Sequence, residues 1–105
     1  MDKIPISIKK TIDEYLYTLK NNNIPIQHAI LFGSYANGNY TGNSDIDIAL
    51  VSDFFDGIRF LDRKKIIKIT LKVSKEIEPL PFNPKQFTID DPFVREIIET
   101  GINLV

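Results

Sequence analysis

The feature that most constrains this chain is the alternation Asp45-Ile46-Asp47-Ile48 near the end of the stretch Leu31–Val51. Successive side chains of a β-strand point to opposite faces of its sheet. A strand over Asp45–Val51 therefore places both aspartates on one face and both isoleucines on the other. We expect the isoleucine face to pack in a core and the aspartate face to carry chemistry.

Two carboxylates placed two residues apart on one strand repel each other, so the site resists holding both charges without compensation. Magnesium is a usual compensation, because it prefers oxygen ligands and keeps positions open for phosphate oxygens. Gly33-Ser34 lies upstream of the aspartates, at the end of an apolar run. A glycine lets the backbone approach a phosphate, and a serine hydroxyl with exposed backbone N–H groups can hydrogen-bond its oxygens. The stretch therefore predicts a site for a metal ion and a triphosphate.

These residues resemble a known signature. The order Gly33-Ser34, ten intervening residues, then Asp45-Ile46-Asp47-Ile48 is similar to the motif of the DNA polymerase beta-like nucleotidyltransferase superfamily. The short chain resembles its minimal nucleotidyltransferase (MNT) branch, whose members are often encoded beside a HEPN-type partner as antitoxin and toxin. The resemblance implies the polymerase beta-like fold, an α/β (α+β) arrangement in which helices cover a small mixed sheet of three to four strands.

A third carboxylate is expected from residues 75–82, which predict a strand ended by prolines. Strand alternation puts Glu76 and Glu78 on the face opposite Ile77, so either can join the aspartates if this strand lies beside theirs. In the superfamily that the chain resembles, a third carboxylate comes from such a neighbouring strand. We assign Glu78 to this role and keep Glu76 as the alternative. Two surface charges on an edge strand would give the same pattern.

The resemblance implies an activity and assigns roles to the site residues. The activity is transfer of a nucleoside monophosphate, by default AMP from ATP, to a hydroxyl group with release of pyrophosphate. Asp45, Asp47 and Glu78 would be catalytic residues and ligands of one or two Mg²⁺ ions, while Gly33 and Ser34 would bind the nucleotide. The resemblance to the antitoxins of HEPN/MNT pairs implies that the acceptor hydroxyl belongs to a HEPN-type toxin, which AMP transfer would silence.

Two other functions remain open. A non-catalytic antitoxin would neutralise its partner by contact alone, although a pure binder has no physical need for a repelling carboxylate pair. A free-standing enzyme would act on a small molecule or a nucleic acid end. Six basic residues in the stretch Ile58–Ser74 could contact nucleic acid, but such a run is usually a solvated face, and the net charge of −1 gives no general attraction. Many relatives carry an arginine or lysine at the position of Asn37, so one phosphate contact is missing here.

Composition and length limit the class of protein. With 105 residues, 43% of them hydrophobic, we expect residues 1–105 to form one domain with a single core. The lack of cysteine excludes disulfides and thiolate metal sites. The first residues do not show the apolar segment of a secretory signal, and no stretch has the length needed to span a bilayer. We therefore expect a cytoplasmic protein, with homo-oligomerisation left open.

Periodicity and end signals predict the remaining elements. Apolar residues at spacings of three and four predict helices over Pro5–Asn22 and Ile58–Ser74. Asp91-Pro92 and Gly101 delimit a predicted helix over Pro92–Thr100. The core face of the helix at Ile58–Ser74 is expected to comprise Leu61, Ile66, Ile67, Leu71 and Val73, with its basic residues largely in water.

Shorter elements are expected between and after these helices. A strand should start near His28, which we interpret as a boundary residue rather than a ligand. Tyr35–Ser44 should begin as a short helix and continue as a loop, because Gly38, Asn39, Gly42 and Asn43 favour turns. Ile102–Val105 should add a short last strand.

Overall fold

The computed structural model describes residues 4–105 as alternating helices and strands. The order agrees with the sequence-based expectation, and the boundaries differ by one or two residues at most ends. The elements are α1 (Ile6–Asn21), β1 (His28–Phe32), α2 (Ser34–Asn37), β2 (Ile46–Val51), α3 (Arg59–Val73), β3 (Ile77–Phe82), α4 (Pro92–Thr100) and β4 (Ile102–Asn103).

The strands form one four-stranded mixed sheet in the order β3-β2-β1-β4. Strand β1 runs antiparallel to both β2 and β4, whereas β2 and β3 are parallel. A parallel pair needs a long crossover connection, and α3 provides it. The α/β (α+β) prediction with a small mixed sheet is therefore confirmed.

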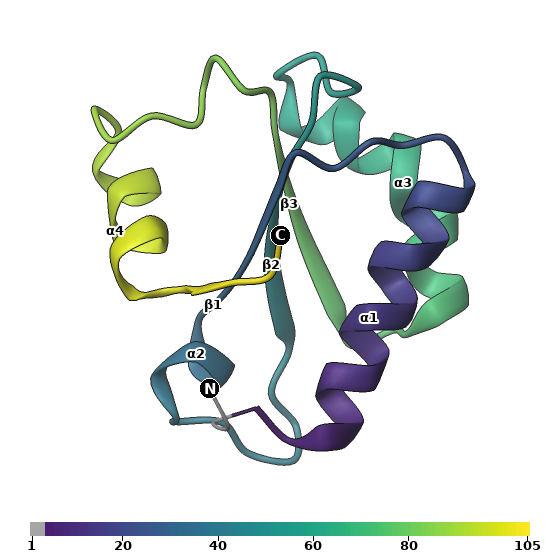
Figure 1. Ribbon diagram of the computed structural model, residues 1–105, viewed down its shortest axis with the longest axis vertical. Helices are drawn as coiled ribbons and strands as arrows, with labels where there is room; N and C mark the ends of the chain where they lie inside the picture. Colours follow the sequence, from purple (N-terminus) through teal and green to yellow (C-terminus); the bar gives the residue numbers. More distant parts are fainter. Residues whose placement is uncertain (1–3) are drawn as a thin grey trace.

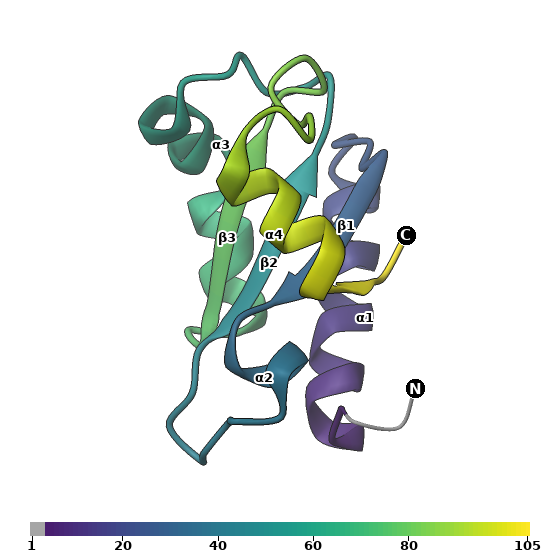
Figure 2. The same ribbon diagram turned by 90° about the vertical axis from the view of Figure 1, so that its left-hand side faces the viewer.

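Helices cover the two faces of the sheet unequally. Helices α1 and α3 lie on one face and α4 lies on the other, as Figure 1 and the turned view in Figure 2 show. On the first face Ile46, Ile48 and Leu50 of β2 join a large cluster with residues of α1 and α3. On the second face Ala49 and Val51 pack in a smaller cluster with α4. The second face is left uncovered at the start of β2, where Asp47 lies.

Helix α1 packs as its apolar spacing predicts. Ile12, Tyr15 and Leu19 are buried, and Pro5 occupies the position before the first helical residue. The Tyr15 hydroxyl shares a hydrogen bond of 2.7 Å with Thr70 Oγ1 of α3. Burial raises the pKa of Tyr15 to about 12, and the hydrogen bond with Thr70 opposes that shift. This pair fixes the two helices to each other across the core.

Helix α3 corrects the predicted core face. Leu61 and Leu71 are 44% and 58% exposed, while Asp62, Ile66 and Thr70 are buried. The prediction was wrong for the two leucines because polar partners compensate burial of Asp62 and Thr70, and apolar spacing cannot detect such partners. The Thr70 hydroxyl also donates to the Ile66 carbonyl at 2.9 Å.

The buried Asp62 organises the loop between β2 and α3. Its two carboxylate oxygens accept hydrogen bonds from the backbone N–H groups of Asp56 and Gly57, each at 2.9 Å. Lys65 Nζ lies 3.4 Å from Asp62 Oδ1 and 2.9 Å from Asp56 Oδ2. Lys65 is exposed, as expected for the basic side chains of this helix, but its ammonium group is also bound to the loop.

Helix α4 begins and ends where predicted. Asp91 Oδ1 accepts a hydrogen bond of 2.9 Å from the Phe93 N–H, and Pro92 occupies the first turn. Gly101 ends the helix with an extended backbone, with a φ of −81° and a ψ of 174°. A Cβ at this position would overlap Ile30 and the carbonyl of Ile97, so close packing of α4 on β1 requires glycine there.

Strand β3 continues through the prolines that were predicted to end it. Pro79 and Pro81 are both within the strand. The carbonyls of Glu76 and Phe82 accept hydrogen bonds from Ile46 and Ser52, at 2.8 and 3.1 Å. Because alternate residues bond towards β2, the two prolines fall at positions that face away from it, and an edge strand tolerates their missing N–H groups.

None of the helices that residues 4–105 form has both the length and the apolar character needed to cross a membrane.

Candidate functional site

The turn after β1 brings the two halves of the sequence motif together. Gly33 follows Phe32 with φ of +75° and ψ of −150°, a region that is essentially restricted to glycine. Its carbonyl accepts hydrogen bonds from the N–H groups of Ala36 and Asn37 at 3.1 and 3.0 Å. Ser34 therefore starts α2, one residue earlier than expected, and the glycine conformation directs the chain from the strand into this short helix.

Asp47 occupies the centre of the candidate site. It is half-buried as the second residue of β2, and its Cα pairs with Phe32 of β1 and with Glu78 of β3. A Cβ added at Gly33 would overlap Asp47 Oδ2. The Gly33 backbone thus lies directly against the Asp47 carboxylate, which is the juxtaposition that the spacing of the motif predicts.

Asp45 lies beside this centre but outside the strand. Strand β2 begins at Ile46, so the prediction that the strand starts at Asp45 was wrong by one residue. The Asp45 side chain is exposed at the end of the α2–β2 loop. Its charge nevertheless acts on Asp47, as the electrostatics of that residue show.

The pKa of the Asp47 carboxyl is raised above its ordinary value. Burial is the largest cause, followed by the negative charge of Asp45 and then that of Glu78. Glu76 does not contribute to this shift, and it lines a separate hollow with Ser7 and Tyr40 near the start of α1. The structure therefore brings Glu78, rather than the alternative Glu76, into electrostatic contact with Asp47.

Arg63 is the neighbour of this site that sequence reasoning missed. Its Nη1 donates to Glu78 Oε2 in an ion pair and to the Pro79 carbonyl at 3.3 Å. The basic run in α3 was recognised in the sequence, but its relation to Glu78 depends on how α3 lies against the edge strand β3. Arg63 is half-buried, so the expectation that the basic side chains of α3 lie largely in water holds less well for it.

The donor chemistry of the three carboxylates fits a hard divalent cation. Asp45, Asp47 and Glu78 offer only oxygen ligands, and a cation would relieve the repulsion that raises the pKa of Asp47. Within residues 4–105, however, no three acidic, histidine or cysteine side chains are gathered into a group that could hold a metal. Glu78 pairs with Arg63 instead, so side-chain rotation is needed to complete such a set.

A small hollow of about 80 Å³ adjoins Gly33 between β1, α2 and α4. Asn37, Glu96 and Thr100 contribute its polar side chains. The ring centres of Phe93 and Phe32 lie 6.2 Å apart in an edge-to-face contact. The side chain at position 37 is therefore close to the glycine turn, as the motif implies, but it brings no positive charge.

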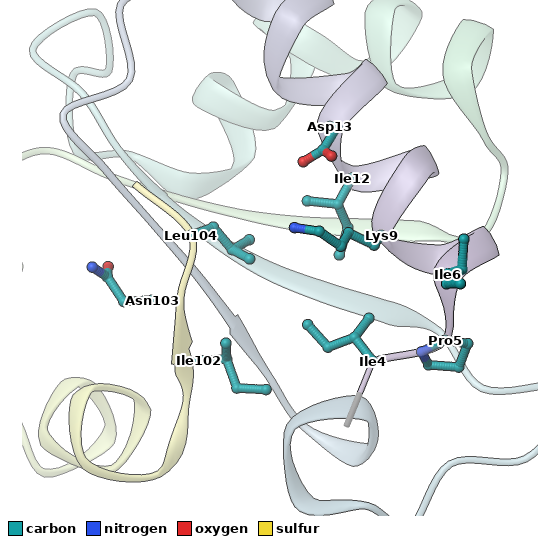
Figure 3. Close-up of a pocket in the computed structure, with 9 residues that line it drawn as sticks. All are labelled: Ile4, Pro5, Ile6, Lys9, Ile12, Asp13, Ile102, Asn103 and Leu104. Carbon is teal, nitrogen blue, oxygen red and sulfur yellow. The ribbon is translucent and has the colours of Figure 1, made fainter. Parts of the chain in front are cut away.

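The other features noted in the sequence lie away from this site. His28 is exposed at the opposite end of β1, paired with Val51, as expected for a boundary residue. A cavity of about 590 Å³ lies between the start of α1 and β4. Figure 3 shows Lys9 and Asp13 projecting from α1 into it. The cavity contains none of the predicted site residues.

The fold and the position of the motif define the class of this protein. Residues 12–104 match the family described as "Nucleotidyltransferase domain". The chain belongs to this nucleotidyltransferase family, which confirms the resemblance drawn from Gly33-Ser34 and the two aspartates. Proteins of the family generally use a nucleoside triphosphate and a divalent metal ion.

Particular relatives narrow the comparison. The chain is 40% identical over 97 residues to "Putative protein adenylyltransferase MJ0604" of Methanocaldococcus jannaschii, covering 89% of this chain and 93% of that protein. It is 32% identical over 81 residues to "Putative protein adenylyltransferase MJ0141" of the same organism, covering 75% of this chain and 79% of that protein. A solved structure described as a toxin-antitoxin with AMP-PNP shares the fold, with a TM-score of 0.61 and 24% identity over 88% of this chain and 71% of that one.

Proposed function

We propose that this protein is a metal-dependent nucleotidyltransferase that transfers AMP from ATP to a hydroxyl of a partner protein, a HEPN-type toxin, and thereby acts as an antitoxin. Asp45, Asp47 and Glu78 are the catalytic and metal-binding residues of this proposal, and Gly33 and Ser34 bind the nucleotide. Residues 1–105 form the single catalytic domain.

The observation that carries the proposal is the contact between the Gly33 turn and the Asp47 carboxylate. A phosphate that approaches the Gly33 backbone must come next to Asp47, and two anions cannot share that space without a cation. Asp45 and Glu78 add negative charge at the same place. The arrangement suits a triphosphate that arrives with its metal ion, and it has no evident use in a surface that binds by contact alone.

Each residue of the proposed site then has a defined role in the reaction. Gly33 and Ser34 position the phosphates, and Asp45, Asp47 and Glu78 would hold Mg²⁺, which when bound neutralises phosphate charge and lowers the pKa of the acceptor hydroxyl. The acceptor oxygen forms a bond to the α-phosphorus while the bond from that phosphorus to the bridging oxygen breaks. Pyrophosphate leaves, and the hydroxyl proton is released to water. The protein contributes position and charge rather than a covalent intermediate.

The openness of the site supports a large acceptor molecule. Asp45 and Glu78 are exposed, Asp47 is half-buried, and α4 packs on the later residues Ala49 and Val51 of β2, so a large molecule can reach Asp47. Two similar proteins of Methanocaldococcus jannaschii are named as protein adenylyltransferases, and a protein of the same fold has been crystallised as a toxin-antitoxin with AMP-PNP. These likenesses support a protein acceptor, ATP as the donor and a toxin as the partner.

Transfer of α-labelled ATP into a lysate of the source organism tests this proposal. The intact protein and Mg²⁺ should label one protein band, and Asp47→Asn should abolish the labelling. Asp53→Asn is the matched control, because Asp53 is an exposed aspartate directly beyond the other end of β2. Label on RNA or on a small molecule would show a different acceptor, and equal labelling by the Asp47→Asn variant would contradict the proposed site.

A further inference from the structure

The two arginines of α3 reach over the edge of the sheet towards the face that carries Asp47. Arg59 and Arg63 are one helical turn apart, so their side chains project from the same side of α3. The Arg59 guanidinium lies 5.4 Å from the centre of the Phe82 ring, and Arg63 pairs with Glu78. Glu78 and Phe82 share the same strand face, because they are four residues apart on β3. Each arginine thus contacts one residue of the edge strand β3.

Arg63 is the only one of the two that acts on the site. Its Nη1 also donates to the Pro79 carbonyl at 3.3 Å, which fixes the guanidinium at the backbone of β3. The Glu78 carboxylate is therefore drawn towards α3 at the outer edge of the sheet. Glu78 is at the same time the strand neighbour of Asp47. Rotation about its side-chain bonds can bring its carboxylate inward without any change in the backbone.

The same carboxylate consequently has two alternative cationic partners. Its side chain is 49% exposed and that of Arg63 is 34% exposed, so neither is fixed by packing and the exchange has a small cost. A divalent cation beside Asp47 would attract Glu78 inward, whereas Arg63 holds it outward. We propose that Arg63 is a positioning residue that competes with the divalent cation for Glu78 and so lowers the affinity of the site for metal. This inference rests on the proposed function, since it takes Asp47 to be a metal ligand.

A titration with Mn²⁺, followed by electron paramagnetic resonance of the free ion, measures the competition without any transfer reaction. Mn²⁺ takes the same oxygen ligands as Mg²⁺. We expect Arg63→Ala to lower the dissociation constant for Mn²⁺ about two- to fivefold, which is the range set by the loss of one exposed ion pair. Arg63→Lys, which keeps a charge but loses the planar fork, should lie between Arg63→Ala and the wild type.

Arg59→Ala is the matched control. This substitution removes the same charge from the same side of α3, but the Arg59 side chain contacts Phe82 rather than Glu78. It should leave the dissociation constant unchanged, and equal tightening by Arg59→Ala and Arg63→Ala would overturn the inference, because general charge would then explain both. Thermal unfolding of each variant checks that the fold is retained.

The Glu78→Gln background isolates the pairwise effect. There Arg63→Ala should no longer change the dissociation constant, since the shared carboxylate is gone. An undiminished Arg63→Ala effect in that background, or no effect in the wild-type background, would overturn the role of Arg63.

Asp47→Asn separates this failure from the failure of the proposed function. If Asp47→Asn leaves Mn²⁺ binding unchanged, the metal site itself is wrong; if it abolishes binding while Arg63→Ala changes nothing, only the role of Arg63 is wrong.

Discussion

Two aspartates, Asp62 in helix α3 and Asp47 in strand β2, lie in very different surroundings. Asp62 is completely buried beyond the end of β2, where it accepts two backbone hydrogen bonds and lies 3.4 Å from Lys65. Asp47 is half-buried near the start of β2, where its charged neighbours are Asp45 and Glu78. The negative charge of Asp62 is therefore compensated by hydrogen bonds and a lysine, whereas that of Asp47 is repelled by two neighbouring carboxylates.

The difference supports the proposal that Asp62 has a structural role and Asp47 a functional one. Asp62 stabilises the loop between β2 and α3, and its hydrogen bonds and its lysine partner compensate its charge without any further ligand. The environment of Asp47 costs folding free energy, because burial and neighbouring charges both disfavour its ionised form. A carboxylate with a raised pKa beside a glycine turn is a candidate functional residue, and the proposed function gives it the role of binding a cation.

Removal of the hydrogen-bonded carboxylate of Asp62 should have the largest effect on stability. Asp62→Ala leaves the N–H groups of Asp56 and Gly57 without acceptors inside the protein and removes one of the two carboxylate partners of Lys65. We expect a loss of about 3 kcal/mol in the free energy of unfolding, measured by urea denaturation. Asp56→Ala is the control, since it keeps its backbone N–H and removes only a surface ion pair, and its loss should be much smaller. Equal losses would mean that Asp62 does not organise the loop.

An intermediate effect is expected at Gly33, where structure and site meet. Gly33→Ala must adopt a φ near +75°, at a cost of about 1–3 kcal/mol, and its Cβ would displace the Asp47 carboxylate. Urea denaturation should show this loss, and AMP transfer should fall steeply. Gly42→Ala is a matched control in the following loop, because a Cβ there meets no atom within 4 Å and needs no left-handed backbone. Normal transfer by Gly33→Ala would contradict the close approach of nucleotide to this turn.

The smallest effect on stability is expected from Asp47→Asn. Unlike the two substitutions above, it should stabilise the protein. The pKa of Asp47 is raised in the folded protein, so between the unfolded value of 3.8 and the raised value the folded state binds more protons than the unfolded state. The contribution of Asp47 to stability therefore falls as pH rises through this window. In the presence of EDTA, Asp47→Asn should gain stability relative to the wild type as pH rises from 3 to 8, with no gain below 3.8.

Urea denaturation at a series of pH values measures this difference. A variant that becomes less stable than the wild type as pH rises would show that the Asp47 carboxylate is satisfied after all. Asp53→Asn, an exposed aspartate, should show no such trend.

Local signals predicted much of this structure. The start of α4 follows from Asp91-Pro92 because capping involves only neighbouring residues. The contact of Gly33 with Asp47 follows from a strand, a turn and a returning strand, for which the motif spacing is sufficient. Strand alternation also restricted the third carboxylate to Glu76 or Glu78.

What the sequence did not reveal depends on contacts between distant segments. The sequence favoured Glu78 but kept Glu76 open, because it does not give the register of β2 against β3, which aligns Asp47 with Glu78. Burial of Asp62 and Thr70 in α3 depends on loop amides and on Tyr15, so a pattern of apolar residues favoured Leu61 and Leu71 instead. The link between Arg63 and Glu78 depends on how α3 lies along the edge of the sheet, and no local spacing encodes it.

The most direct test of the central claim compares the stability of the wild type and Asp47→Asn at pH 7, first in EDTA and then with Mg²⁺ and ATP. A ligand that binds only the folded state stabilises it in proportion to the logarithm of its concentration over its dissociation constant. The account predicts a reversal: the variant is the more stable protein in EDTA, and the wild type is the more stable one with Mg²⁺ and ATP. Equal stabilisation of both proteins by Mg²⁺ and ATP, or none of either, would contradict the assignment of Asp47 as the centre of a metal-nucleotide site.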